Sequence, residues 1–81
     1  MMQAFYKTKP TQDTPYRQLN LRCEDGWLLQ LIGGTKWGRE YAKVLKSGSV
    51  QNFDEGRVLY DREFIKLQEE GWKTYSPHEP W

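Results

Sequence analysis

The chain is poor in the residues that hold metal ions, form disulfides or act as nucleophiles. It contains one cysteine and one histidine in 81 residues, which excludes an intramolecular disulfide and a cysteine-based zinc site. The pattern around Cys23 predicts an inward-facing thiol, which burial makes inert, and His78 lies near the end of the chain. Adjacent carboxylates such as Glu69 and Glu70 are typical of a solvated helix face. We therefore predict no catalytic residue, no metal site and no cofactor, and we do not expect an enzyme.

The chain also lacks a strong net charge and long apolar runs. Its formal charge is +1 at pH 7, which gives no general attraction to nucleic acid or to a membrane surface. The charges are unevenly distributed, since residues 1–46 hold eight Lys and Arg against four Asp and Glu, whereas residues 47–81 hold four against seven. No run approaches the length that spans a bilayer, and the first residues do not resemble a signal peptide. These features predict a cytoplasmic protein with no membrane partner.

The strongest structural signal is the stretch Leu19–Ile32, which predicts a β-hairpin. Asp25-Gly26 between two apolar runs is typical of a hairpin turn, because glycine adopts positive φ without a Cβ clash. A three-residue loop, Glu24-Asp25-Gly26, pairs Leu21 with Leu29 and makes one face wholly apolar, whereas a two-residue loop mixes apolar and polar residues. We predict the three-residue loop. Because the second strand is apolar on both faces, it should lie inside the sheet.

A C-terminal helix is predicted from the residues that begin and end helices. Asp61 is a good N-cap, and the helix should run from there to Glu70. Gly71 follows as the left-handed residue that closes many helices. Asp54 is a rival N-cap, but a helix that begins there must include Gly56, which lowers helix stability.

Residues 35–50 fit two structures. As a helix, the segment places several apolar side chains on one face. As strands, Glu40–Lys46 alternates between two faces, and Ser47-Gly48-Ser49 turns the chain into a further strand. We favour strands, because Gly38 disfavours the first helical turn and because a third strand would cover the exposed edge of the hairpin.

The whole pattern predicts a small α+β domain. Gln3–Thr8 is a candidate edge strand, residues 9–15 form a proline-punctuated loop, and Trp72–Tyr75 forms a short last strand. The predicted fold is an antiparallel meander of about four to five strands packed by one C-terminal helix. Residues 1–75 make the single domain, and residues 76–81 make an extended or disordered tail. The predicted core is apolar and comprises Leu19, Leu21, Trp27, Leu29, Leu31, Val44, Phe64, Ile65, Leu67 and Trp72.

Trp37-Gly38-Arg39 spells the tripeptide that names the WGR domain, and the chain from Trp27 to Tyr75 resembles that family in its order of elements. The family is a small β-rich module with a C-terminal helix, found in some DNA-repair proteins. The chain departs from the family pattern after the tripeptide, where Glu40-Tyr41 replaces a small residue and a glycine. The strand expected just before the motif is also shorter here. We carry no functional residue across from the family.

Basic and aromatic residues are interleaved between positions 36 and 46, a pattern typical of surfaces that bind single-stranded nucleic acid. We assign Arg17 and Arg22 to the outward face of the first hairpin strand, where they would add positive charge. If Trp37 and Tyr41 lie in the core instead, the lysines are only their solvated neighbours. The near-neutral total charge favours this second interpretation.

A protein partner is the leading functional prediction. Trp81 ends a proline-containing tail that is suited to docking on a partner, and exposed edge strands can extend a sheet across an interface. We therefore predict an accessory or adaptor protein that binds another protein or a second copy of itself. Nucleic-acid binding by residues 36–46 is the alternative. The predicted binding surface is Arg17, Arg22, Lys36, Trp37, Arg39, Lys43, Lys46 and Trp81.

Overall fold

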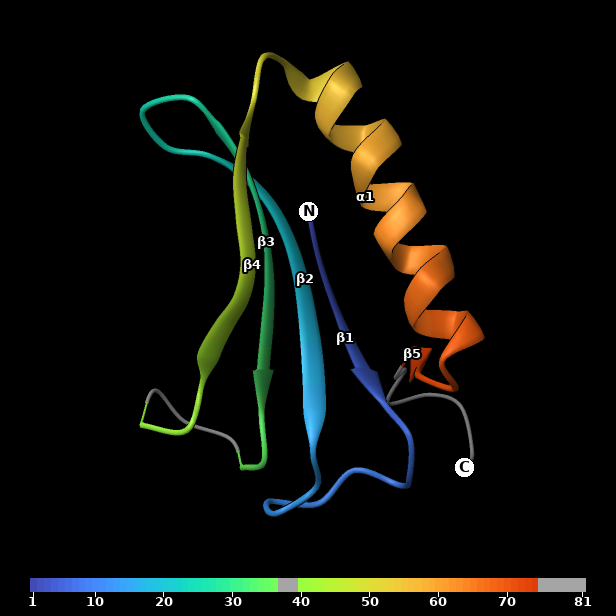
Figure 1. Cartoon of the computed structure of the whole chain (residues 1–81). Helices are drawn as coiled ribbons and strands as arrows, with labels where there is room; N and C mark the ends of the chain where they lie inside the picture. The colour runs from blue at the N-terminus through green and yellow to red at the C-terminus, as the bar shows by residue number, and fades with distance from the viewer. Residues whose placement is uncertain (37–39, 75–81) are drawn as a thin grey trace.

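The computed structural model describes residues 1–36 and 40–74, which form a five-stranded antiparallel sheet with one helix on one face (Figure 1). The elements in chain order are β1 (Met2–Tyr6), β2 (Tyr16–Cys23), β3 (Trp27–Gly34), β4 (Lys43–Val50), α1 (Phe53–Glu69) and β5 (Lys73–Thr74). The strand order is β4-β3-β2-β1-β5, so α1 carries the chain from one edge of the sheet to the other. The predicted α+β meander with a C-terminal helix is confirmed.

The β2–β3 hairpin has the predicted register. Leu21 pairs with Leu29 and Cys23 pairs with Trp27, which leaves three residues in the loop. Gly26 has φ 117°, the positive value expected at the last residue of a three-residue loop, and Asp25 also has positive φ, 54°. β3 lies between β2 and β4, so its predicted place inside the sheet is also confirmed.

Residues 43–50 form one continuous strand. The preference for a strand over a helix is confirmed, but the predicted turn at Ser47-Gly48-Ser49 is wrong. These residues pair in regular register with β3, where Gly48 faces Leu29. The register shifts once, so that Leu45 forms a bulge. The hydrogen-bonding edge of β3 therefore outweighs the turn preference of a short Ser-Gly-Ser sequence.

Helix α1 begins eight residues earlier than the predicted start at Asp61, and its N-cap is Asn52. The Glu55 backbone N–H donates to Asn52 Oδ1 at 2.9 Å, and the Gln51 N–H donates to Glu55 Oε2 at 3.3 Å. This reciprocal arrangement is close to a capping box. Asp61 lies inside the helix, where its Oδ1 accepts a bond from Arg57 Nε at 3.3 Å. The helix includes Gly56, which is buried.

The end of α1 agrees with the prediction. Gly71 has φ +96°, and its N–H donates to the Gln68 carbonyl at 3.0 Å. The Trp72 N–H donates to the Leu67 carbonyl at 2.9 Å, which completes a Schellman motif. This turn buries Trp72, and the next two residues pair with β1 as the predicted short strand.

β1 agrees only in part with its assignment to the sheet edge, because β5 covers its last two residues and leaves Met2–Ala4 at the edge. It pairs with β2 along its whole length, and Phe5 and Tyr6 also pair with β5. Both of these residues are buried, although neither was in the predicted core. The sequence pattern missed them because the elements next to β1, the helix with its Phe64 ring and the short strand β5, lie far along the chain.

The core lies between the sheet and α1, with three corrections to the prediction. Val44 and Ile65 are 57% and 54% exposed, because Val44 lies on the edge strand away from the helix and Ile65 lies on the outer side of α1. Cys23 is exposed rather than inward, because the turn end of the hairpin projects away from the helix (Figure 1). The buried residues of this core are Phe5, Leu19, Leu21, Leu31, Tyr60, Leu67 and Trp72. Tyr6 and Tyr16, which pair with each other, are buried on the opposite face of the sheet.

Candidate functional site

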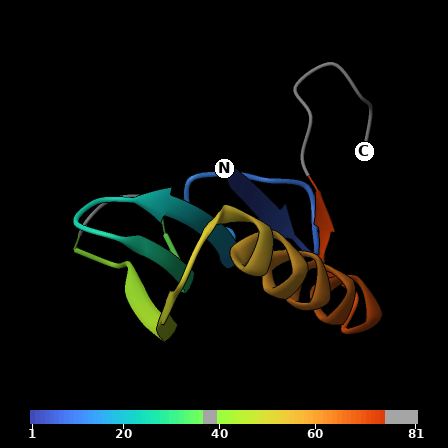
Figure 2. The ribbon, with the colours of Figure 1, turned by 90° about the horizontal axis from the view of Figure 1, so that it is seen from above.

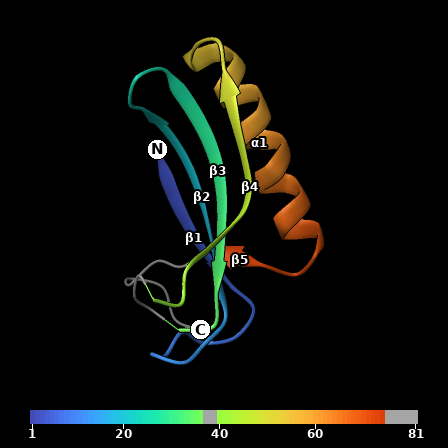
Figure 3. The same cartoon turned by 60° about the vertical axis from the view of Figure 1, so that its left-hand side comes forward.

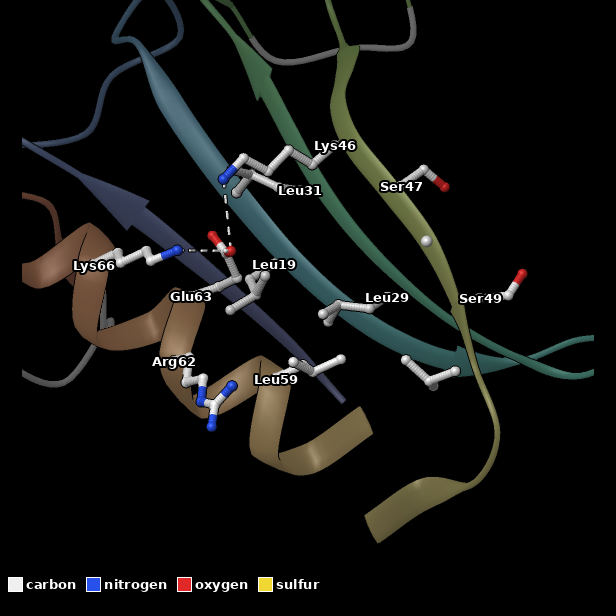
Figure 4. Close-up of a pocket in the computed structure, with 12 residues that line it drawn as sticks. Leu19, Leu29, Leu31, Lys46, Ser47, Ser49, Leu59, Arg62, Glu63 and Lys66 are labelled. Carbon is white, nitrogen blue, oxygen red and sulfur yellow. Dashed lines mark ion pairs between the residues drawn. The ribbon is translucent and has the colours of Figure 1, made fainter. Parts of the chain in front are cut away.

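A groove of about 330 Å³ runs between the edge strand β4 and helix α1 (Figure 4). Its floor is formed by Leu19, Leu29 and Leu31 of the central strands, and Leu59 supplies an apolar wall from the helix. The other wall is the second half of β4, from Ser47 to Val50.

The groove exists because α1 contacts β2 and β3 more extensively than β4. Seen from above, β4 stands apart from the helix, which lies closer to the other strands (Figure 2). Gly48 faces the helix side of the sheet, since it pairs with the floor residue Leu29. A Cβ at Gly48 would meet no atom within 4 Å, so this position leaves the groove open. Ser47 and Ser49 point away from the helix (Figure 4).

The outer edge of β4 is available for pairing within the described part of the chain, because β4 is the last strand of the sheet (Figure 3). An edge strand presents unpaired N–H and C=O groups, and proteins usually protect it with charges, prolines or bulges. The first half of β4 has such protection in Lys43, Lys46 and the bulge at Leu45. Ser47–Val50 has small side chains, no charge and a regular register. This half of the edge is the part that borders the groove.

The charged end of the groove carries two lysines and one carboxylate. Glu63 Oε1 lies 3.6 Å from Lys46 Nζ on β4 and 3.6 Å from Lys66 Nζ on α1. The Glu63 side chain is 19% exposed, whereas the two lysine side chains are 62% and 61% exposed. Arg62 also lines the groove, but its side chain points away from these three and lies nearer Leu59 (Figure 4). The balance of charge at this end therefore favours an additional anion.

A second, basic pocket of about 450 Å³ contains Lys7, Arg17 and Lys43. The Arg17 Cζ and Lys7 Nζ atoms lie 4.5 Å and 4.9 Å from the centroid of the Trp72 ring, within the range of cation–π attraction. Tyr41 also lines this pocket, and its side chain is exposed, so it is not a core residue. No acidic side chain lines the described part of the pocket.

The predicted binding residues that the structure describes do not form one surface. Lys46 lies at the groove, and Arg17 and Lys43 lie in the basic pocket. Arg22 pairs with Glu24 at 3.6 Å on the opposite face of β2 from Arg17. The assignment of both arginines to one outward face is therefore wrong, because odd and even positions of a strand alternate between faces.

The remaining predicted site residues fall at the margin of the described chain. Lys36 Nζ lies 3.7 Å from Asp13 Oδ1 and 5.4 Å from the centroid of the Tyr41 ring. Trp37, Arg39 and Trp81 lie outside the described residues, as does the tail at 76–81.

Sequence reasoning missed most of the groove. Leu59 precedes the predicted helix and Gly48 falls in the predicted turn, so no sequence pattern indicates that the two residues line the same groove. Arg62, Glu63 and Lys66 fall within the predicted helix, but nothing in the sequence indicates that they border a groove. The sequence signal that could have revealed this wall of the groove is the capping pair Asn52 and Glu55. This pair predicts a helix that begins early enough to include Leu59.

The described residues contain no other group with an obvious chemical role. No three His, Cys, Asp or Glu side chains in 1–36 and 40–74 gather closely enough to hold a metal ion. No helix among these residues has the length and apolar composition needed to cross a membrane.

Burial raises the pKa of the Tyr60 phenol, against the opposing effect of Arg57, so this core residue stays neutral at physiological pH.

The comparisons with known proteins identify no family for this chain. The tripeptide on which the resemblance to the WGR domain depends, residues 37–39, lies outside the described residues. No protein-family model, curated protein or solved structure matches the chain.

Proposed function

We propose that this chain is a small, non-enzymatic accessory protein of the cytoplasm that binds extended segments of other proteins by adding a strand to β4. The observation that carries the proposal is the uncharged edge at Ser47–Val50, which directly borders an apolar groove. A free thiol at Cys23 is compatible with a reducing compartment.

Strand addition would use both features of this surface. The unpaired backbone groups of β4 would bond to the backbone of the added segment, which supplies affinity with little dependence on sequence. Alternate side chains of that segment would face the helix and reach the apolar floor at Leu29 and Leu59, which supplies specificity. The open space over Gly48 is the position where a large side chain of the partner would fit.

Gly48→Leu should weaken peptide binding at least tenfold, because the new side chain would fill the groove. The free protein has room for it, since a Cβ at this position meets no atom within 4 Å. The measurement is selection of a displayed random-peptide library on the full chain, followed by fluorescence-anisotropy titration of the selected peptides. Ser49→Leu is the matched control, because it adds the same side chain one residue away on the opposite face.

The control variant should lose much less affinity than Gly48→Leu, because its new side chain lies on the face of β4 opposite the groove, although Ser49 belongs to the same pairing edge. Amide resonances of β4 should shift on binding in the unchanged protein. A library that yields no saturable binder, or binders that Gly48→Leu leaves unaffected, would contradict strand addition at this groove.

Nucleic-acid binding is a second candidate, favoured by one specific observation. The basic pocket brings Lys7, Arg17 and Lys43 together with the Trp72 and Tyr41 rings, and no acidic side chain lines its described part. Clustered cations beside aromatic rings are what a single strand uses for backbone and base contacts. Two of these cations already lie over the Trp72 ring, so base stacking would have to use the more exposed Tyr41.

If this second candidate holds, a short single-stranded oligonucleotide should quench tryptophan fluorescence at low salt. With about three phosphate contacts, affinity should fall roughly 20-fold between 50 and 200 mM salt through counterion release. Lys43→Glu should abolish binding, whereas Lys66→Glu, a matched charge reversal at the groove, should have a much smaller effect. Fluorescence that does not change at either salt concentration would rule out this candidate.

A further inference from the structure

We infer that the segment added to β4 is acidic at one end and apolar at the other, and that Glu63 occupies the position of its acidic group in the free protein. This inference depends on the proposed strand addition. It follows from the polarity of the groove, which has the Lys46, Glu63 and Lys66 charges at one end and the apolar Leu29 and Leu59 side chains further along (Figure 4).

The register of β4 gives the spacing of the partner's side chains. Lys46, Gly48 and Val50 face the helix side of the sheet, since they pair with Leu31, Leu29 and Trp27. Residues directly opposite each other on paired strands share a face and lie close enough to interact. An added strand therefore presents three successive helix-facing side chains to these positions, each two residues from the next.

Each of the three positions selects a different side chain. Opposite Val50, the neighbouring surface is apolar and includes Leu59. Opposite Gly48, a large apolar side chain of the partner can extend over the Gly48 backbone, which carries no side chain, towards Leu29. Opposite Lys46, the nearest groups are ammonium ions, which favour a carboxylate. The expected segment carries two apolar residues and one Asp or Glu at alternate positions, with the acidic residue at the Lys46 end.

Glu63 is the group with which this carboxylate competes. It is the single acid among the side chains that line the groove, and it bridges the two walls by its ion pairs to Lys46 and Lys66. A partner carboxylate near Lys46 would meet both the attraction of the lysines and the repulsion of Glu63. Removing the Glu63 charge takes away the carboxylate with which Lys46 and Lys66 form ion pairs. Glu63→Gln should therefore strengthen the binding of acidic segments and leave neutral ones unchanged.

The test uses two nine-residue peptides with blocked ends. In each peptide, threonine alternates with the residues that would face the helix. These helix-facing residues are apolar except for the last, which is Glu in one peptide and Gln in the other. Each is also made in reverse order, because the added strand could run in either direction. Anisotropy titration of the full chain should show the Glu peptide binding about threefold to fivefold tighter than the Gln peptide at low salt. Glu63→Gln should widen this preference by a similar factor. Glu69→Gln, the matched change elsewhere on α1, should not.

The outcomes separate this inference from the proposed function. Equal binding of the Glu and Gln peptides, both lost in Gly48→Leu, would overturn the acidic preference and leave strand addition in place. Failure of every peptide to bind would overturn strand addition and the inference with it. A concentration-dependent doubling of mass by light scattering, abolished by Gly48→Leu, would assign the groove to a second copy of the chain and overturn the acidic partner.

Discussion

Phe5→Ala should lower the free energy of unfolding by about 3–5 kcal/mol and the midpoint of thermal unfolding by at least about 12 °C. Phe5 has no exposed surface, and its ring meets the Phe64 ring edge-on, with 4.9 Å between the ring centroids and 72° between the planes. Its strand lies between β2 and β5, so the surrounding backbone cannot easily collapse into the cavity. Urea and thermal unfolding monitored by circular dichroism would measure the loss.

This loss would be a large share of the stability of the domain, since a chain of this length has a total free energy of unfolding of roughly 4–12 kcal/mol. Ile65→Ala is the control: it removes a side chain of similar apolar character that is 54% exposed on α1, next to the ring that Phe5 contacts. That variant should lose less than about 1 kcal/mol. Comparable losses in the two variants would mean that β1 does not supply the centre of the core.

Gly56→Ala should destabilise the protein by about 1–2 kcal/mol, although alanine is the better helix former by about 1 kcal/mol. A Cβ at this position would lie 2.7 Å from Leu21 Cδ1 and 3.1 Å from Val50 Cγ2. Leu21 has no exposed surface, so its methyl group has little room to move away. The helix can therefore approach the sheet this closely only with glycine at this position. Chemical unfolding at 25 °C would give the difference in stability.

A double-mutant cycle isolates the contact. Leu21→Ala alone should cost about 2–5 kcal/mol, because it leaves a cavity beneath the helix. In that background the methyl group of Gly56→Ala has space, so the second substitution should be neutral or stabilising, with a coupling energy of about 1–3 kcal/mol. If Gly56→Ala stabilises the unchanged protein, helix propensity outweighs the close packing and the contact is looser than the distances indicate.

Local sequence determined the features whose interactions lie within a few residues of one another. The β2–β3 register followed from the Asp25-Gly26 turn and the alternation of leucines on both sides of it. The Schellman motif followed from Gly71, whose positive φ needs no support from the rest of the protein. The strands and the helix, and hence the α+β class, were predictable because their apolar residues recur with periods of two and of about 3.6.

Tertiary structure decided the elements whose local preferences were weak or opposed. Ser47–Ser49 favours a turn by composition, yet the unpaired edge of β3 holds it extended. Gly56 argued against a helix, yet it is the residue that allows α1 to lie against Leu21. Local preferences of this kind are worth about 1 kcal/mol, whereas burial of one large side chain contributes about 1.5–3 kcal/mol, so packing outweighs them.

The sequence by itself determined the class of fold, the central hairpin and the end of the helix. Only the tertiary structure decided which aromatic residues fill the core and that a groove lies between β4 and α1. Its lining comes from β2, β3, β4 and α1, so no stretch of sequence contains the pattern. The physical reason is that a groove is defined by space left unfilled, such as that over Gly48, and unfilled space depends on how distant elements approach one another.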